Sequence, residues 1–250
     1  MKSILKIVAL FVMALMVGVV QATPVSGQGT WEANLLSRDL DGNGVTDAFY
    51  DVTLKITWLA NVSSASNWDA AQLWAGNLTF GGYTDWRLPT MENSYKSGCD
   101  FSYAGGTDCG YNVRTAASEV ANLWYISLGN KSSCDPATSN ATDECGEQAG
   151  AGLTNTGQFF NLVSGYYWFG TEFEPDYVGI AWSFAADVGA QIPNYKYQNF
   201  LAIAVRDGDV GTGTELPSIP EPESLALVGI ALAGLGLTRR KSKVLVAYAQ

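Results

Sequence analysis

Two apolar stretches, one near each end of the chain, limit the part that can fold as a globular domain. The first covers residues 7–20, after a short basic start and before the small residue Ala22. This order of basic residues, apolar core and small residues is typical of a cleaved secretory signal. We therefore expect residues 1–22 to be a signal peptide, and a retained N-terminal anchor is the alternative.

The second apolar stretch covers residues 225–237 and is followed by a basic cluster. A helix of this length rises about 20 Å, less than the roughly 30 Å of a hydrocarbon core, so it would span a membrane only marginally. Because basic clusters stay on the cytoplasmic side, we expect everything between the two apolar stretches to lie on the far side.

The C-terminal segment resembles a known sorting signal. Its proline-glutamate-proline motif, apolar stretch and arginine pair are similar to the PEP-CTERM signal of Gram-negative bacteria that make exopolysaccharide. The resemblance implies an exosortase as processing partner, with transient anchoring in the inner membrane through the apolar helix. The matching residues are Pro220, Glu221, Pro222, Arg239 and Arg240.

These signals predict the domain organisation. We expect a globular domain at residues 23–210, a linker rich in glycine and threonine at 211–219, and the sorting signal at 220–243. Residues 244–250 form a tail that such signals usually lack. The globular part should then work outside the cytoplasm, in the periplasm, envelope or extracellular matrix.

The part between the two ends is strongly acidic. The chain has 14 basic and 24 acidic residues; six basic residues lie in the end segments, while every acidic residue lies between Glu32 and Glu223. Eight basic residues therefore stand against 24 acidic ones, a net charge of −16. Such a surface repels phosphate backbones and sulfated glycans, so we exclude nucleic acid as a partner.

Four cysteines lie in two close pairs, Cys99 with Cys109 and Cys134 with Cys145. In an exported chain this spacing indicates disulfides, and the two local bridges are the simplest of three connectivities. A metal site is the alternative, weakened because the sequence has no CxxC spacing and no histidine. Each bridge would close a loop of about a dozen residues and stabilise the fold by about 3 kcal/mol.

Secondary-structure patterns favour an α+β fold. Residues 50–58 alternate between apolar and polar, which predicts a half-buried strand. Asn67 is the predicted cap of a helix ending near Gly76, and residues 115–128 predict a second helix. We expect a single domain with a largely antiparallel sheet, two main helices and long disulfide-stapled loops. The other predicted strands are residues 166–171, 180–186 and 200–205.

Short motifs in the body resemble the Lcl C-terminal-like domain, long carried as a domain of unknown function, over about residues 45–210. The most specific is Asp-Trp-Arg-Leu-Pro-Thr at residues 85–90. The resemblance implies an adhesin-like or ligand-binding module akin to C-type lectin folds. For the collagen-linked namesake it implies adhesion to sulfated polysaccharide, which the few basic residues here argue against. The motifs occupy residues 47–51, 56–59, 81–90, 167–172, 204–206 and 208–210.

The segment at residues 39–47 matches a calcium-binding loop. Oxygen-bearing side chains stand at loop positions 1, 3, 5 and 9, with a glycine at position 6. Tyr50 replaces the usual glutamate at position 12, and a turn that needs no metal is the alternative. The predicted calcium ligands are Asp39, Asp41, Asn43 and Asp47.

Three other side chains are candidates for ligand contacts. Arg87 stands in an apolar motif close to Asp85 and is either a ligand-facing cation or an acid-paired structural arginine. Tyr195 and Tyr197 are a candidate platform for stacking on sugar rings, with core packing as the alternative for such aromatic residues.

Catalysis finds little support in the sequence. The lack of histidine excludes His-based triads and His-rich zinc sites. Glu172 and Glu174 are a pair of nearby carboxylates, expected in an exposed hairpin loop. We therefore expect a non-enzymatic envelope or matrix protein that binds exopolysaccharide or other surface proteins. The alternatives are a cell-surface glycan hydrolase with paired carboxylates and a passive coat protein.

Overall fold

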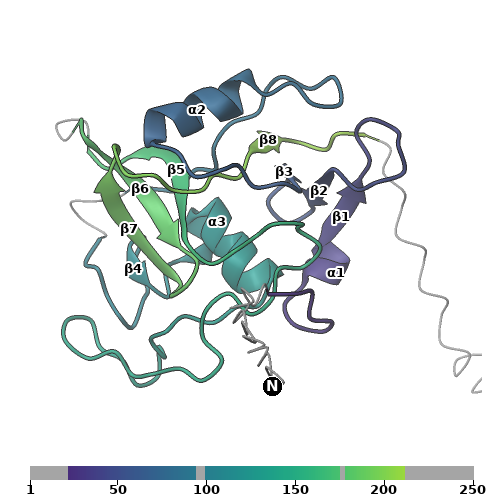
Figure 1. Ribbon diagram of the computed structural model, residues 1–250. Helices are drawn as coiled ribbons and strands as arrows, with labels where there is room; N and C mark the ends of the chain where they lie inside the picture. The colour runs from purple at the N-terminus through teal and green to yellow at the C-terminus, as the bar shows by residue number, and fades with distance from the viewer. Residues whose placement is uncertain (1–21, 94–98, 175–177, 212–250) are drawn as a thin grey trace, which may run out of the picture.

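Two four-stranded antiparallel sheets lie at opposite sides of the molecule (Figure 1). The computed structural model describes residues 22–93, 99–174 and 178–211. The core of the predicted signal peptide, nearly all of the linker, the sorting signal and the tail lie outside these ranges. The first sheet has the order β1-β2-β3-β8 and the second the order β4-β7-β6-β5. With helices between them, the architecture is α+β with antiparallel strands, as the sequence predicts, but the strands form two sheets where the sequence predicts one.

The first sheet joins the earliest strands of the domain to the last one. Phe49 in β2 stands opposite Trp58 in β3, and Trp58 stands opposite Val205 in β8. This pairing brings the end of the described chain back to its beginning. The strands are β1 (Leu35–Arg38), β2 (Ala48–Asp51), β3 (Ile56–Leu59) and β8 (Val205–Asp207).

The prediction of one strand at residues 50–58 is wrong, because the chain turns between β2 and β3. The carboxylate of Asp51 accepts hydrogen bonds from the backbone N–H groups of Thr53 and Leu54, at 2.9 and 3.0 Å. Lys55 completes the turn with a φ of 58°. Asp51 is fully buried, so a residue that the alternation placed towards solvent is the one that closes the turn.

In the second sheet, the hairpin of β5 and β6 agrees with the prediction. Tyr167 stands opposite Phe184, and Trp168 opposite Ser183. The predicted strand at residues 200–205 is wrong, because only its last residue belongs to a strand; Leu201 makes a single parallel bridge to Tyr167 as the chain crosses between the sheets. The strands are β4 (Gly110–Tyr111), β5 (Tyr166–Glu172), β6 (Ile180–Ala185) and β7 (Ala190–Tyr195).

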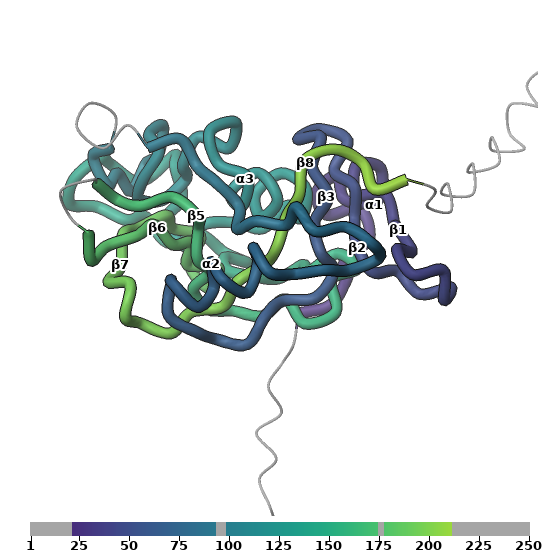
Figure 2. Tube along the Cα trace, turned by 90° about the horizontal axis from the view of Figure 1, so that it is seen from above, coloured from purple at the N-terminus to yellow at the C-terminus, as the bar shows by residue number. Residues whose placement is uncertain are grey.

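The helix α2 (Trp68–Asn77) begins where the sequence predicts. The side chain of Asn67 accepts a hydrogen bond from the N–H of Ala70 at 2.9 Å, which satisfies a donor that the first helical turn leaves unpaired. Figures 1 and 2 show α2 over one face of the molecule, between the two sheets. Leu73, an apolar residue of this helix, is 65% exposed.

The predicted helix at residues 115–128 is broken into short pieces. Ser118 has an extended backbone, and its hydroxyl caps the next turn by accepting from the N–H of Ala121 at 3.2 Å. This cap interrupts a helix that apolar spacing alone would continue. The pieces are a 3-10 turn (Thr115–Ala117), α3 (Glu119–Ala121) and a π-helical turn (Asn122–Ser127), and α1 (Trp31–Asn34) lies earlier in the chain.

Aromatic residues form most of the core. A large cluster contains side chains of both sheets and α3, among them Trp58, Trp182 and Phe184. A second cluster lies beneath α2 and contains Trp68 and Trp168. Burial of such side chains is the main stabilising contribution to the fold.

Both predicted disulfides are present, Cys99–Cys109 and Cys134–Cys145. The side-chain amide of Asn112 donates to the carbonyl of Cys134 at 2.7 Å, so the two bridged loops are held together. No helix in the described part of the chain has the length and apolar character needed to span a bilayer.

Candidate functional site

The tyrosine platform predicted from the sequence lies on the surface. Tyr195 ends β7, and the rings of Tyr195 and Tyr197 stack with their centroids 5.3 Å apart and an interplanar angle of 16°. They are 54% and 74% exposed. Lys196, between them, points away: its Nζ lies 4.1 Å from the ring centre of Trp68 and 3.1 Å from the carboxylate of Glu172. The pair therefore presents ring surface to solvent.

Arg87 is fully engaged with acids. It donates two hydrogen bonds to Glu119, at 2.8 and 2.9 Å, and a third to Asp207 at 2.6 Å. The bonds to Glu119 are the main reason why its pKa lies above the ordinary value. Asp85, its neighbour in sequence, pairs with Arg206 instead. Of the two alternatives for Arg87, this geometry supports a structural arginine that is paired with acids.

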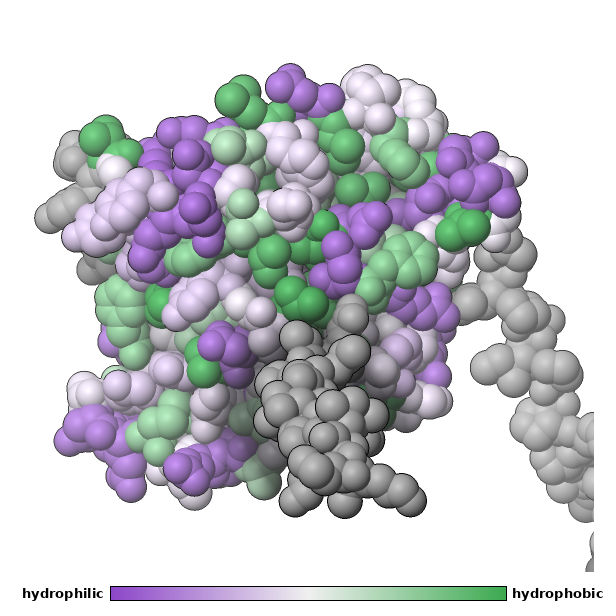
Figure 3. Space-filling view, in the orientation of Figure 1, coloured by the Kyte–Doolittle hydropathy of each residue, from purple (hydrophilic) through white to green (hydrophobic). Residues whose placement is uncertain are grey.

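The loop between β1 and β2 brings together three of the four predicted calcium ligands. Carboxylate oxygens of Asp39, Asp41 and Asp47 lie within 4.8 Å of one another. Hydrophilic residues gather over this loop in Figure 3. The fourth residue, Asn43, turns its side-chain oxygen to the N–H of Val45, at 2.7 Å.

Backbone donors hold the first acid of this loop. Asp39 accepts hydrogen bonds from the N–H groups of Gly44, Gly42 and Asn43, at 2.8, 2.8 and 3.2 Å. These bonds, that from Gly44 above all, lower the pKa of Asp39. Clustered carboxylate oxygens are ligands that calcium prefers, so the donor set fits this ion.

A pocket of about 470 Å³ opens between α2 and two loops. Trp74 reaches it from α2, and Leu78 reaches it from the residue directly after the helix, where the backbone is extended. Phe80 follows after the helix and is held by backbone hydrogen bonds with Tyr83 in both directions. The pocket is lined by Asp47, Leu59, Ala60, Asn61, Val62, Ser63, Trp74, Leu78, Phe80, Phe160 and Asn161.

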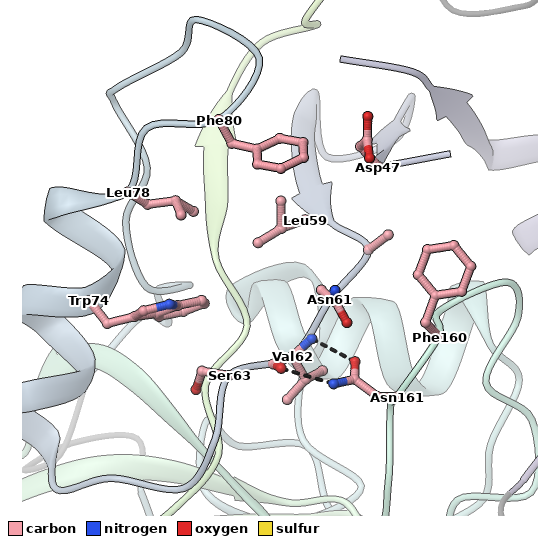
Figure 4. A pocket seen from close by; sticks show the side chains of 11 residues that line it. Asp47, Leu59, Asn61, Val62, Ser63, Trp74, Leu78, Phe80, Phe160 and Asn161 are labelled. Carbon is pink, nitrogen blue, oxygen red and sulfur yellow. Dashed lines mark hydrogen bonds between the residues drawn. The ribbon is translucent and has the colours of Figure 1, made fainter. Parts of the chain in front are cut away.

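The opposite wall of the pocket is fixed by an amide bridge (Figure 4). Asn161 accepts from the N–H of Val62 at 2.7 Å and donates to its carbonyl at 3.0 Å. Next to it, the N–H of Phe160 donates to the carbonyl of Ala60 at 3.3 Å. The ring of Phe160 is 53% exposed and faces the pocket from the side opposite Trp74.

The comparisons with known proteins concern the C-terminal segment. The PEP-CTERM protein-sorting motif matches residues 218–241. The predicted sorting signal is thereby confirmed, and the motif supports an exported protein sorted by an exosortase in a Gram-negative envelope. No curated protein matches the chain at a significant level. The resemblance to the Lcl C-terminal-like domain stays a prediction.

Sequence reasoning missed the aromatic pocket because its parts come from distant segments. Leu59, Trp74 and Phe160 belong to no common periodic pattern. One signal was available: Phe159 and Phe160 are adjacent in a polar loop, and only the first is buried. Two neighbouring large apolar residues in a loop cannot easily share one core-facing direction, so one of them is left for the surface.

Proposed function

We propose that the chain is an exosortase-sorted protein whose globular domain is a non-catalytic binding module for exopolysaccharide in the envelope or extracellular matrix. The observation that carries the proposal is the exposed, stacked pair of Tyr195 and Tyr197. Sugar rings have apolar faces and polar edges, and an exposed aromatic plane is complementary to such a face. Export by a sorting signal puts the module where such polymers accumulate.

The net charge of the part between the two ends limits which kinds of polysaccharide can bind. With a net charge of −16, an uncharged or weakly charged polysaccharide avoids the repulsion that a sulfated one would meet. Three of the four described arginines, Arg38, Arg87 and Arg206, each form a short ion pair with an acid, so they offer little free positive charge to a polyanion. We therefore include calcium at residues 39–47 as a proposed stabiliser of the acidic surface.

Retention on purified exopolysaccharide tests the proposal. Replacing both tyrosines, Tyr195→Ala with Tyr197→Ala, should weaken retention about thirtyfold, because each of the two rings contributes on the order of 1 kcal/mol. Leu73→Ala is the matched control, since Leu73 is an equally exposed apolar residue on α2. Equal retention of the tyrosine variant and the control would contradict the proposal.

Incubation with the same purified exopolysaccharide distinguishes binding from hydrolysis. Glu172, one of the two carboxylates considered for an enzyme, forms an ion pair with Lys196. We expect no new reducing ends when the protein is incubated with the polymer. Reducing ends that appear with the native protein and disappear with Glu172→Gln would establish a glycan hydrolase instead.

A further inference from the structure

The aromatic pocket beside α2 has the dimensions and walls of a small-molecule site. Its volume of about 470 Å³ lies within the usual range for ligand pockets of roughly 300–1,000 Å³. Trp74, Phe80 and Phe160 converge on it from three separate segments of the chain. None of the three is fully buried, so ring surface remains uncovered at the pocket.

The polar groups at the pocket divide into used and available ones. Asn161 is occupied by Val62, and the hydroxyl of Ser63 donates to the carbonyl of Ser64 and accepts from the N–H of Ala202. Asn61 is exposed, and Figure 4 shows its amide between the two aromatic walls. Asp47 accepts from the N–H of Leu40 through Oδ2, which leaves Oδ1 for another donor.

The walls do not have to be assembled when a ligand arrives. The two hydrogen bonds between Val62 and Asn161 fix one loop against the other. On the acidic side, the N–H of Ala60 donates to the backbone carbonyl of Asp47 at 2.8 Å. A preformed site loses little conformational entropy on binding, so a few contacts are enough for measurable affinity.

The lining also limits the charge of the ligand. It contains one carboxylate, Asp47, and no basic residue. In the absence of calcium, uronate, sulfate or phosphate groups would meet a negative charge that no side chain of the lining compensates. An apolar ligand would leave the amide of Asn61 and the carboxylate of Asp47 without partners. A ring with apolar faces and uncharged hydroxyl groups satisfies both kinds of lining.

We propose that this pocket binds a neutral hexose unit of a glycan, packed against the rings of Trp74 and Phe160 and hydrogen-bonded to Asn61 and Asp47. The inference rests on the proposed function for the class of ligand only. The pocket shares no lining residue with the tyrosine pair, so it is a second and separate contact.

Titration calorimetry of the secreted protein with defined oligosaccharides tests the pocket. The probes are neutral di- to tetrasaccharides of glucose, galactose or mannose, with trigalacturonate as the anionic counterpart. In calcium-free buffer at low salt, we expect at least one neutral series to bind, and trigalacturonate to bind about tenfold more weakly. Tighter binding of trigalacturonate, or no binding of any neutral series, would overturn the inference.

Two variants identify the site. Trp74→Ala should weaken oligosaccharide binding about tenfold. Asn61→Ala should also weaken it severalfold, and because Asn61 is exposed this variant keeps the fold even where the tryptophan variant does not. Unchanged affinity in folded Asn61→Ala and Trp74→Ala proteins would overturn the inference.

The tyrosine variants separate this inference from the proposed function. Tyr195→Ala with Tyr197→Ala should leave the affinity for short neutral oligosaccharides unchanged. If no oligosaccharide binds while retention on the polymer still depends on the tyrosines, the pocket inference fails and the proposed function stands. If the tyrosine variants abolish oligosaccharide binding, the assignment to the pocket is wrong.

Discussion

At the scale of single residues, arginine determines how this acidic domain is held together. Arg87 links Glu119, at the start of α3, to Asp207, at the end of β8. The motif that contains Arg87 attracts attention as a binding sequence because a lone cation stands among apolar residues. Its partners are 32 and 120 residues away, so the sequence offers no way to choose between a ligand and a structural acid.

Removal of this arginine should cost stability. We expect Arg87→Ala to lower the free energy of unfolding by about 2 kcal/mol, because Glu119, only 17% exposed, keeps its charge without its partner. Arg114→Ala is the control, since Arg114 is 48% exposed and lies 3.9 Å from Glu92; it should change stability by less than about 0.5 kcal/mol. Urea unfolding measures both, and equal effects would contradict a structural role for Arg87.

A second ion pair predicts a pH dependence. Arg38 donates to both carboxylate oxygens of Asp209, at 2.7 and 2.8 Å, and this lowers the pKa of Asp209. The unfolded chain, with an Asp pKa of about 3.9, then binds more protons than the folded one, so this contribution to stability is present above that pH and is lost as pH falls through the folded pKa.

The variant Asp209→Asn tests whether this contribution to stability is lost as pH falls. At pH 7 it should be less stable than the native protein by about 1 kcal/mol, a small value because Asp209 is 41% exposed. The difference should shrink below about pH 4. Asp187→Asn, at an exposed carboxylate without an ion pair in the described part of the chain, is the control. A difference that stays constant from pH 7 to pH 3 would contradict the argument.

At the scale of elements, local signals predicted local structure well and failed where one side chain redirected the chain. Asn67 and α2 were predictable because the cap and its donor are three residues apart. The turn at Asp51 was not, because period-two alternation carries no information on whether a polar residue faces solvent or closes a turn. The break at Ser118 has the same origin, a hydroxyl that competes with the helix.

The loop between β1 and β2 carries a prediction for calcium. If calcium binds the carboxylates of Asp39, Asp41 and Asp47, saturating calcium should raise the melting temperature by about 3 °C, because a ligand that binds only the folded state stabilises it. Magnesium should have a smaller effect, since it needs stricter geometry.

Two variants test whether the calcium-dependent rise in melting temperature comes from this loop. Asp41→Ala should abolish the calcium-dependent shift, and Asp187→Asn should leave it unchanged. A thermal-shift titration without any response to calcium in the native protein would remove calcium from the proposed function, while the glycan contacts would be unaffected.

At the scale of the whole molecule, the sequence predicted the sorting signal and the disulfides better than it predicted the binding surface. The sorting motif is contiguous, so its chemistry can be recognised in the printed order of residues. The disulfides were equally accessible, because each bridge closes a short loop. The pocket was not, because its walls meet only after residues about 100 apart, such as Val62 and Asn161, have been brought together.

Deletion of residues 218–241 tests whether the sorting motif determines where in the cell the protein is held. Because the apolar stretch at 225–237 and the basic residues Arg239, Arg240 and Lys241 lie in this segment, its loss should remove membrane retention, and the protein should move to the soluble periplasmic or culture fraction. Deletion of residues 244–250, outside the matched motif, should leave the distribution unchanged. Cell fractionation with immunoblotting measures both, and mass spectrometry shows whether the native protein ends before the basic cluster. An unaltered distribution after deletion of 218–241 would mean that the globular domain alone determines where the protein is held, and retention would then have to be assigned to its glycan contacts.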